Sequence, residues 1–131
     1  MHYLIVVGGD SSDLHFIEAA FAGFPGHNSV MALDTGSALL NWLNQRSFVE
    51  FPFLVIINHP LHGESGLELV TTIKSTGRLK LLPLTLMSLI SHEDEIRSFY
   101  FAGANCFYRK PTEQSEWNHL ADCLITLFAQ F

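Results

Sequence analysis

The sequence predicts an α/β fold, a three-layer doubly wound sandwich built on a five-stranded parallel sheet. Short apolar runs recur five times, and each is followed by a stretch whose apolar residues repeat with helical spacing. Strands separated by helices must pair in parallel through right-handed crossovers, which places helices on both faces of the sheet. With 131 residues, 48% hydrophobic, we expect a single domain over 1–131 and no effector domain.

The first strand and helix are expected close to the start of the chain. Residues 3–7 are apolar and end at Gly8-Gly9, after which Ser11 or Ser12 can cap a helix. The apolar face of this helix would carry Leu14, Ile17 and Phe21.

The same pattern occurs twice more in the middle of the chain. Residues 30–33 predict a second strand, and helical spacing then marks Ala38, Leu39, Trp42 and Leu43. Residues 53–57 are a third strand, since this run of branched apolar residues is too short for a core helix. The third helix is marked by Leu67, Val70 and Ile73.

Two further strand-helix units complete the fold. Residues 84–87 follow Pro83 as a fourth strand, and Ser91 to Asp94 match a capping box that would begin a fourth helix. Residues 106–108 predict the fifth strand, and Thr112-Glu113 starts the last helix. Its buried face would consist of Trp117, Leu120, Ala121, Leu124 and Phe128.

Composition excludes several classes of function. A net charge of −6 with only 7 Lys and Arg leaves no basic stripe for nucleic acid. No apolar run approaches the length of a membrane span and no signal peptide is recognisable, so we expect a cytoplasmic protein without membrane contacts. Cys106 and Cys123 have no metal-ligand spacing and are expected to be reduced, buried thiols.

Asn58 is the most informative residue, because it is the first polar group at the carboxyl end of the third strand. Open α/β sheets bind their ligands at that edge. An aspartate there could attack phosphorus, whereas an asparagine cannot.

Four landmarks in the chain resemble the receiver domain of two-component response regulators, the CheY-like branch of flavodoxin-like folds. They are the first strand and its loop (6–13), the phospho-acceptor strand with the loop and the start of the helix after it (52–68), the fourth strand with its switch hydroxyl (82–88), and the fifth strand (102–111). The resemblance implies strand order 2-1-3-4-5, a role in phosphorelay signalling rather than enzymatic activity, and a histidine kinase or other signalling protein as partner.

The match places functional positions of that family on unexpected residues. The acidic pair falls on Gly8 and Gly9, with Asp10 following, and the acceptor falls on Asn58; the other switch positions fall on Ser88, Phe107, Lys110 and Pro111. We therefore expect a degenerate pseudo-receiver that works without phosphorylation and binds Mg²⁺ weakly or not at all. Without a phosphate, Lys110 is expected to pair with Asp10 or with the side-chain oxygen of Asn58.

Aromatic residues near the end of the chain suggest a protein-binding face. Phe99, Tyr100, Phe101, Tyr108 and Trp117 fall on the fourth helix, fifth strand and fifth helix, and Phe128 and Phe131 add to them. This face would bind a partner protein or a second copy of the chain.

Two alternatives remain open. Phosphorelay could proceed through a non-standard acid such as Asp10. His59, His62 and His92 could instead form a metal site at the same edge of the sheet.

Overall fold

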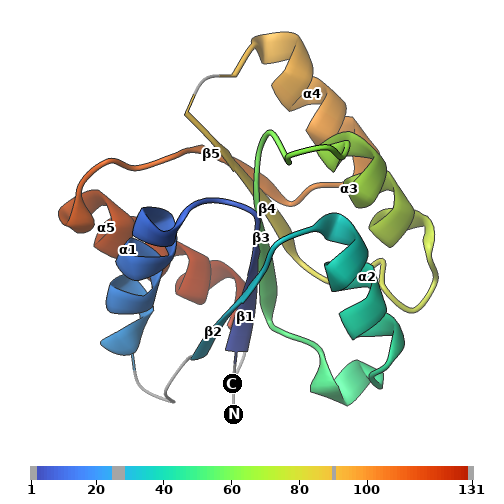
Figure 1. The fold of residues 1–131 in the computed structure, drawn as a ribbon, viewed down its shortest axis with the longest axis horizontal. Coiled ribbons are helices and arrows are strands. Elements are labelled where there is room, and N and C mark those ends of the chain that lie inside the picture. The colour runs from blue at the N-terminus through green and yellow to red at the C-terminus, as the bar shows by residue number, and fades with distance from the viewer. Residues whose placement is uncertain (1–2, 25–28, 90, 130–131) are drawn as a thin grey trace.

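The computed structural model describes residues 3–24, 29–89 and 91–129 and confirms the predicted fold class. Five parallel strands form one sheet in the order β2-β1-β3-β4-β5, as the receiver resemblance implied (Figure 1). The strands are β1 (Tyr3–Val7), β2 (Ser29–Leu33), β3 (Leu54–Asn58), β4 (Leu84–Ser88) and β5 (Cys106–Arg109).

Helices cover both faces of this sheet (Figure 1). They are α1 (Ser11–Ala22), α2 (Gly36–Asn44), α3 (Gly66–Ser75), α4 (Glu93–Ala102) and α5 (Gln114–Phe128), with one short 3₁₀ helix, η1 (Phe48–Glu50), that the sequence pattern did not predict. No helix among the described residues combines the length and apolar composition of a membrane span.

The sheet separates two hydrophobic cores. Because side chains alternate along a strand, Leu4 and Val6 of β1 pack against α1 and α5, whereas Ile5 and Val7 face α2, α3 and α4. β3 and β4 are buried along their whole length, as central strands of a doubly wound sheet should be.

Helix starts differ from the prediction in two places. Asp10, rather than Ser11 or Ser12, caps α1, and its carboxylate accepts a hydrogen bond from the Asp13 N–H. The predicted capping box at the start of α4 is wrong: His92 occupies the N-cap position and no side chain caps the helix there, because the helix begins one residue too late for Ser91 to do so.

Several burial predictions also need correction. Leu69, not Leu67, belongs to the buried face of α3, and Phe128 is only half-buried. Cys106 and Cys123 are free, as predicted, but half-buried rather than buried.

Two of the five aromatic residues predicted to bind a partner are buried in the structure. Phe99 and Trp117 are each only 2% exposed and belong to the core, so neither can contact a partner. Tyr100 is 47% and Phe101 97% exposed, while Tyr108 is half-buried. Neighbouring residues of a helix are separated by about 100°, so a run of three aromatics cannot bury all its members. Phe131 lies outside the described residues.

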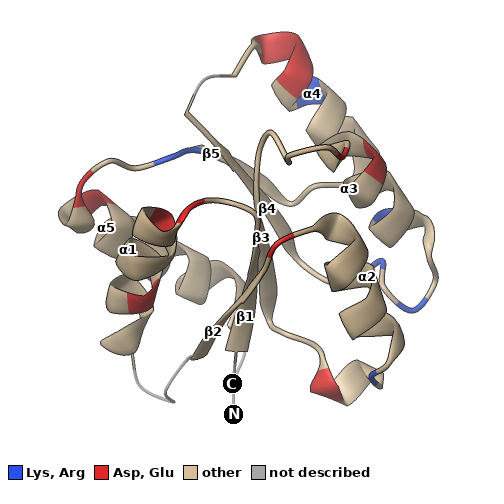
Figure 2. Ribbon diagram, viewed as in Figure 1, with Lys and Arg blue, Asp and Glu red and all other residues tan. Residues whose placement is uncertain are grey.

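Charge is unevenly distributed over the fold (Figure 2). Acidic residues gather in the first turn of α4, at Glu93, Asp94 and Glu95. α3 begins with an acid, Glu68, and ends with Lys74, and Arg78 and Lys80 follow it.

The contrast between Phe99 and Phe101 gives a matched test on one helix. Phe99→Ala should lower the free energy of unfolding by about 3–5 kcal/mol, the usual cost of emptying a core aromatic site. Phe101→Ala should change it by no more than about 0.5 kcal/mol, as at other exposed positions. Chemical denaturation followed by circular dichroism measures both, and equal losses would contradict the burial described above.

Candidate functional site at the carboxyl edge of the sheet

Parallel pairing brings the predicted site residues to one edge of the sheet. Gly8 follows β1, while Asn58 and Ser88 end β3 and β4. Lys110 follows β5, and its N–H donates to the carbonyl of Ser88. These positions form the ligand-binding edge of a doubly wound sheet.

Asn58 is buried, with 3% of its surface exposed, and its amide is turned toward β1. Its Nδ2 lies 3.4 Å from the carbonyl oxygens of both Val7 and Gly8, long distances for hydrogen bonds. Its Oδ1 is buried and has no hydrogen-bond partner among the described residues. The Asn58 side chain thus lies against the carboxyl end of β1, and its amide group is not a nucleophile.

The two glycines are required by this arrangement. Gly8 and Gly9 have φ angles of +75° and +84°, in the left-handed region that favours glycine. A Cβ atom at Gly9 would lie 2.7 Å from Nδ2 of Asn58, which is too close. The backbone seen here therefore cannot accept a carboxylate residue at position 9 unless it or Asn58 moves.

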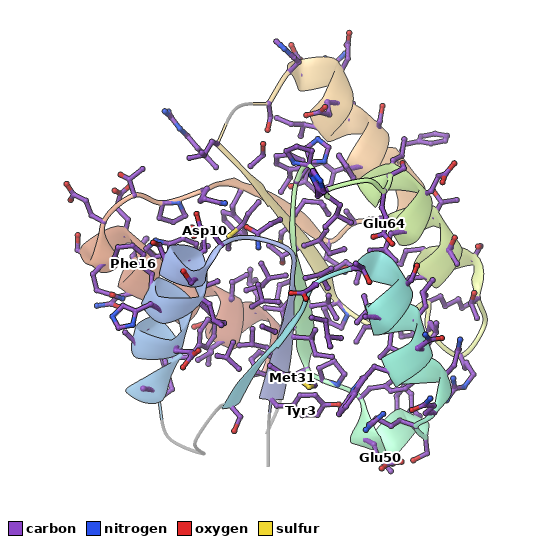
Figure 3. All side chains as sticks on the ribbon, viewed as in Figure 1. Tyr3, Asp10, Phe16, Met31, Glu50 and Glu64 are labelled. Carbon is purple, nitrogen blue, oxygen red and sulfur yellow. The ribbon has the colours of Figure 1, made fainter. Side chains whose placement is uncertain are left out.

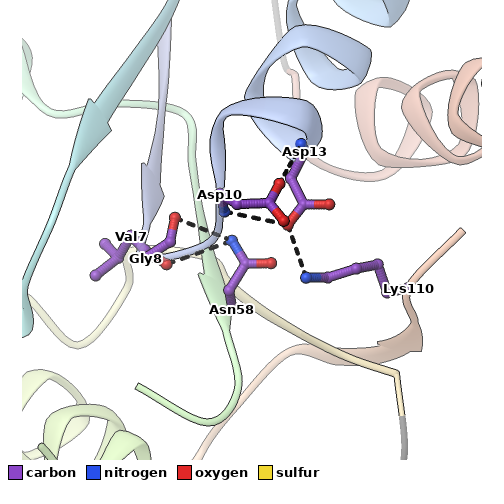
Figure 4. A network of polar contacts seen from close by, with 6 residues as sticks. All are labelled: Val7, Gly8, Asp10, Asp13, Asn58 and Lys110. Atoms are coloured by element: carbon purple, nitrogen blue, oxygen red, sulfur yellow. Dashed lines mark hydrogen bonds and ion pairs between the residues drawn. The ribbon is translucent and has the colours of Figure 1, made fainter. Parts of the chain in front are cut away.

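Lys110 pairs with Asp13, a residue that the sequence interpretation missed (Figure 4). Its Nζ lies 2.8 Å from Oδ2 of Asp13, and the two side chains are only 15% and 13% exposed. The predicted pairing of Lys110 with Asp10 or with the Asn58 oxygen is wrong. The Asp10 carboxylate is engaged as the α1 cap, accepting from the Asp13 N–H at 2.9 Å (Figures 3 and 4).

Local helix geometry explains why Asp13 is available. It occupies the third position of α1, where its Oδ2 also accepts a long 3.4 Å hydrogen bond from the Asp10 N–H. A carboxylate in the first turn is stabilised by the positive end of the helix dipole. The signal in the sequence was the Asp10-x-x-Asp13 spacing, which matches a capping box with aspartate as the reciprocal partner.

The switch positions lie beside a hollow of about 440 Å³. Ser88, only 2% exposed, and Phe107 both line it. The Phe107 ring packs against Phe99, with ring centroids 5.6 Å apart. The backbone N–H of Phe107 donates a hydrogen bond to the Tyr100 hydroxyl at 2.9 Å. Phe107 is thus held by α4, while Pro111 follows Lys110 in the segment leading to α5.

The loop after Asn58 is fastened to α2 by Glu64, a second residue that the sequence interpretation missed (Figure 3). Its carboxylate accepts hydrogen bonds from the N–H groups of Gly36 at 2.7 Å and Ser37 at 3.3 Å, and from the Ser37 hydroxyl at 3.0 Å. The Gly36 hydrogen bond is the main reason that the pKa of Glu64 lies below its ordinary value of 4.5.

The three histidines of the alternative metal site, His59, His62 and His92, do not form a metal-binding cluster. His59 lies against α4, with Nε2 3.1 Å from the Glu95 carboxylate and its ring on Phe99. His62 and His92 are exposed. Within residues 3–24, 29–89 and 91–129, no group of three or more potential ligands is placed to hold a metal ion.

Comparison with solved structures places this fold among response-regulator receivers. The phosphorylated cyanobacterial phytochrome response regulator RcpA superposes with a TM-score of 0.86 at 22% identity, covering 99% of this chain and 96% of that one. Mn²⁺-bound Rcp1 gives 0.81 at 19% identity, covering 96% and 93%. CheY4 of Vibrio cholerae gives 0.75 at 14% identity, covering 95% and 98%. No protein-family model and no curated protein sequence matches the chain. The chain has the receiver fold.

The Lys110–Asp13 pair should contribute measurably to stability. Lys110→Met and Asp13→Asn should each lower the free energy of unfolding by about 2–3 kcal/mol, because each leaves a largely buried charge without its partner. The double variant should be less destabilised than the sum of the singles, with a coupling of about 1 kcal/mol or more. Denaturant titration of all four proteins measures this.

The exposed pair Arg97–Glu93, at 2.6 Å, provides the control. Its side chains are 73% and 76% exposed, so the same cycle there should give less than about 0.5 kcal/mol. Strictly additive losses at Lys110 and Asp13 would contradict the pairing.

Glu64 should make stability sensitive to acid. A carboxylate whose pKa is lowered on folding stabilises the native state above its unfolded pKa, and this contribution is lost as the pH falls through the lower, folded pKa. Glu64→Gln should therefore reduce stability at neutral pH and flatten its pH dependence below the ordinary value of 4.5. Thermal unfolding from pH 7 downward tests this, with Glu68→Gln as a control; parallel wild-type and Glu64→Gln curves would refute it.

Proposed function

We propose that the chain is a receiver-fold signalling protein that acts through protein contacts, without phosphorylation at the carboxyl edge of its sheet. One observation carries the proposal: Asn58 occupies the acceptor position, and the nearby Lys110 is already neutralised by Asp13. A receiver becomes phosphorylated by attack of an aspartate carboxylate on phosphorus. The Asn58 amide offers no such nucleophile.

Weak or absent Mg²⁺ binding follows from the same geometry. Mg²⁺ prefers octahedral oxygen ligands, with carboxylates supplying the charge. Here β1 is followed by two glycines, and the nearby carboxylate of Asp13 is neutralised by Lys110 at 2.8 Å. A divalent ion would have to displace that ammonium, and the neighbouring Asp10 carboxylate is already engaged as the α1 cap.

The alternative in which Asp10 accepts phosphate has little geometric support. Asp10 is exposed and its carboxylate caps α1. Asp13 is the acid that contacts Lys110, so a non-standard acceptor would have to be tested at both positions.

The proposed partner is a histidine kinase, another signalling protein or a second copy of the chain. On the α4–β5–α5 face, Tyr100 is exposed and Tyr108 is half-buried, and Tyr108, Arg109 and His119 help to line a second hollow, also of about 440 Å³. Phe101, which the sequence placed on this face, lines a hollow toward α3 instead. Burial, with a smaller contribution from Cys106, raises the pKa of Tyr108 to about 12. Tyr108 therefore stays a neutral phenol that can donate a hydrogen bond across an interface.

Labelling with a small phosphodonor tests the proposal. With acetyl phosphate and Mg²⁺, the chain should form no acyl phosphate above the level without donor, while a phosphorylatable receiver is labelled in parallel. Asn58→Asp alone should also stay unlabelled, because Gly8 and Gly9 still provide no anions for the metal. Intact-protein mass spectrometry reads both outcomes.

Stable acyl phosphate on the wild-type chain would overturn the proposal. Its loss in Asp10→Asn or Asp13→Asn would then identify the acceptor. Efficient labelling of Asn58→Asp would show that the residues around position 58 bind Mg²⁺ well enough for phosphorylation, and it would contradict the weak Mg²⁺ binding proposed above.

A further inference from the structure

A histidine and a cysteine lie side by side on α5. His119 and Cys123 are four positions apart, so they lie on the same face of the helix, one turn from each other. The Sγ atom of Cys123 is 3.9 Å from Nε2 of His119. Both residues help to line the hollow of about 440 Å³ beside β5, with His119 exposed and Cys123 half-buried. The pair is therefore accessible from solvent.

The distance between these two atoms fits a zinc chelate. Zinc binds thiolate sulfur at about 2.3 Å and imidazole nitrogen at about 2.0–2.1 Å, so two such atoms in a tetrahedral site lie about 3.6 Å apart. The separation of Sγ and Nε2 is only slightly longer, and a small rotation of either side chain on the open helix face closes the difference. Cys106 and Cys123 have no ligand spacing with each other, but Cys123 has it with His119.

The two donor groups select the kind of ion. A thiolate and an imidazole favour zinc and similar ions, whereas Mg²⁺ and Ca²⁺ prefer oxygen ligands. Charge adds little to this selection, because Arg109 and Glu116 line the same hollow with opposite charges. The expected ion is therefore one that binds sulfur and nitrogen.

One chain supplies only half of such a site. Structural zinc is almost always held by four ligands in a tetrahedron. Across the described parts of the chain, no cluster of three or more potential ligands is placed to hold a metal ion, so the pair on α5 stays a pair. A two-fold axis beside α5 would bring the same two residues from a second copy, and two pairs make a Cys₂His₂ set.

We propose that His119 and Cys123 from two copies of the chain bind one zinc ion, which joins the copies through α5. Each thiol loses its proton to the solvent as its sulfur binds the ion, so formation of the site releases two protons. From Gln114 to Phe128, α5 carries Glu116 and Asp122 but no Lys or Arg, so two metal-free α5 helices repel each other. Dimerisation should therefore depend on the metal. This inference goes beyond the function proposed above and uses none of the residues at the carboxyl edge of the sheet.

The test is analytical ultracentrifugation of the full chain in a reducing buffer, with zinc chloride, magnesium chloride or EDTA added. Zinc should convert the monomer into a dimer, and elemental analysis of the dialysed dimer should find one zinc ion for every two chains. EDTA should reverse the association, and magnesium at the same concentration should leave the chain monomeric. Cobalt in place of zinc should give the visible absorption of a tetrahedral site with sulfur ligands.

Cys123→Ser and His119→Gln should each abolish the zinc-dependent dimer and the sulfur-to-cobalt absorption. The matched controls are Cys106→Ser, at the other half-buried cysteine, and His62→Gln, at another exposed histidine. Both control variants should dimerise with zinc as the wild-type chain does. Circular dichroism verifies that each variant is folded, and His119→Gln, at an exposed position, keeps the test decisive if Cys123→Ser does not fold.

The proposal is overturned if zinc leaves the chain monomeric, if each chain binds its own ion without joining another, or if the dimer forms equally in EDTA. It is also overturned if the zinc-dependent dimer survives in His119→Gln or in folded Cys123→Ser. A dimer that forms only without reductant and holds no metal would be a disulfide-linked species and would count against it equally. Acyl phosphate on the chain would refute the function proposed above while leaving the zinc site untouched.

Discussion

The ion pair between Lys110 and Asp13 is the interaction on which the carboxyl edge of the sheet depends. A lysine whose side chain is only 15% exposed is costly to bury unless an anion lies beside its ammonium group. Here the anion comes from the first turn of α1 rather than from the ends of β1 or β3. The pair therefore joins the segment after β5 to α1, two parts of the chain separated by 97 positions.

Because Asp13 provides the negative charge that pairs with Lys110, no acidic residue at the ends of β1 or β3 is required to neutralise this lysine. Gly8 and Gly9 turn the chain through positive φ angles into α1, and Asn58 lies against that turn. Its amide lies 3.4 Å from the carbonyls of Val7 and Gly8, so this side chain packs against the end of β1. An ionised carboxylate at this position could not donate to those carbonyls, because it is only an acceptor.

The sequence was sufficient for the fold because five strand-helix units show clear periodicity, and strand order followed from a resemblance spread over four landmarks. It also located Asn58 and Lys110 at one edge. The sequence did not identify Asp13 as the partner of Lys110. The direction of the Asp13 side chain depends on where α1 begins, and its contact with Lys110 depends on how closely the segment after β5 approaches α1. Nor could the sequence separate Phe99, Tyr100 and Phe101, since spacing on a helix with few apolar residues does not fix which aromatic faces the core.

α4 contacts both β5 and the loop beyond Asn58. The Phe99 ring lies between His59 and Phe107, with centroid distances of 4.9 Å and 5.6 Å, while the Tyr100 hydroxyl holds the Phe107 backbone. Phe101, on the same helix, lines a hollow between α3 and α4. A ligand shifts a conformational equilibrium only as far as it binds one state better than another. A ligand that discriminated between positions of α4 would therefore act on the Phe99 contacts with His59 and Phe107.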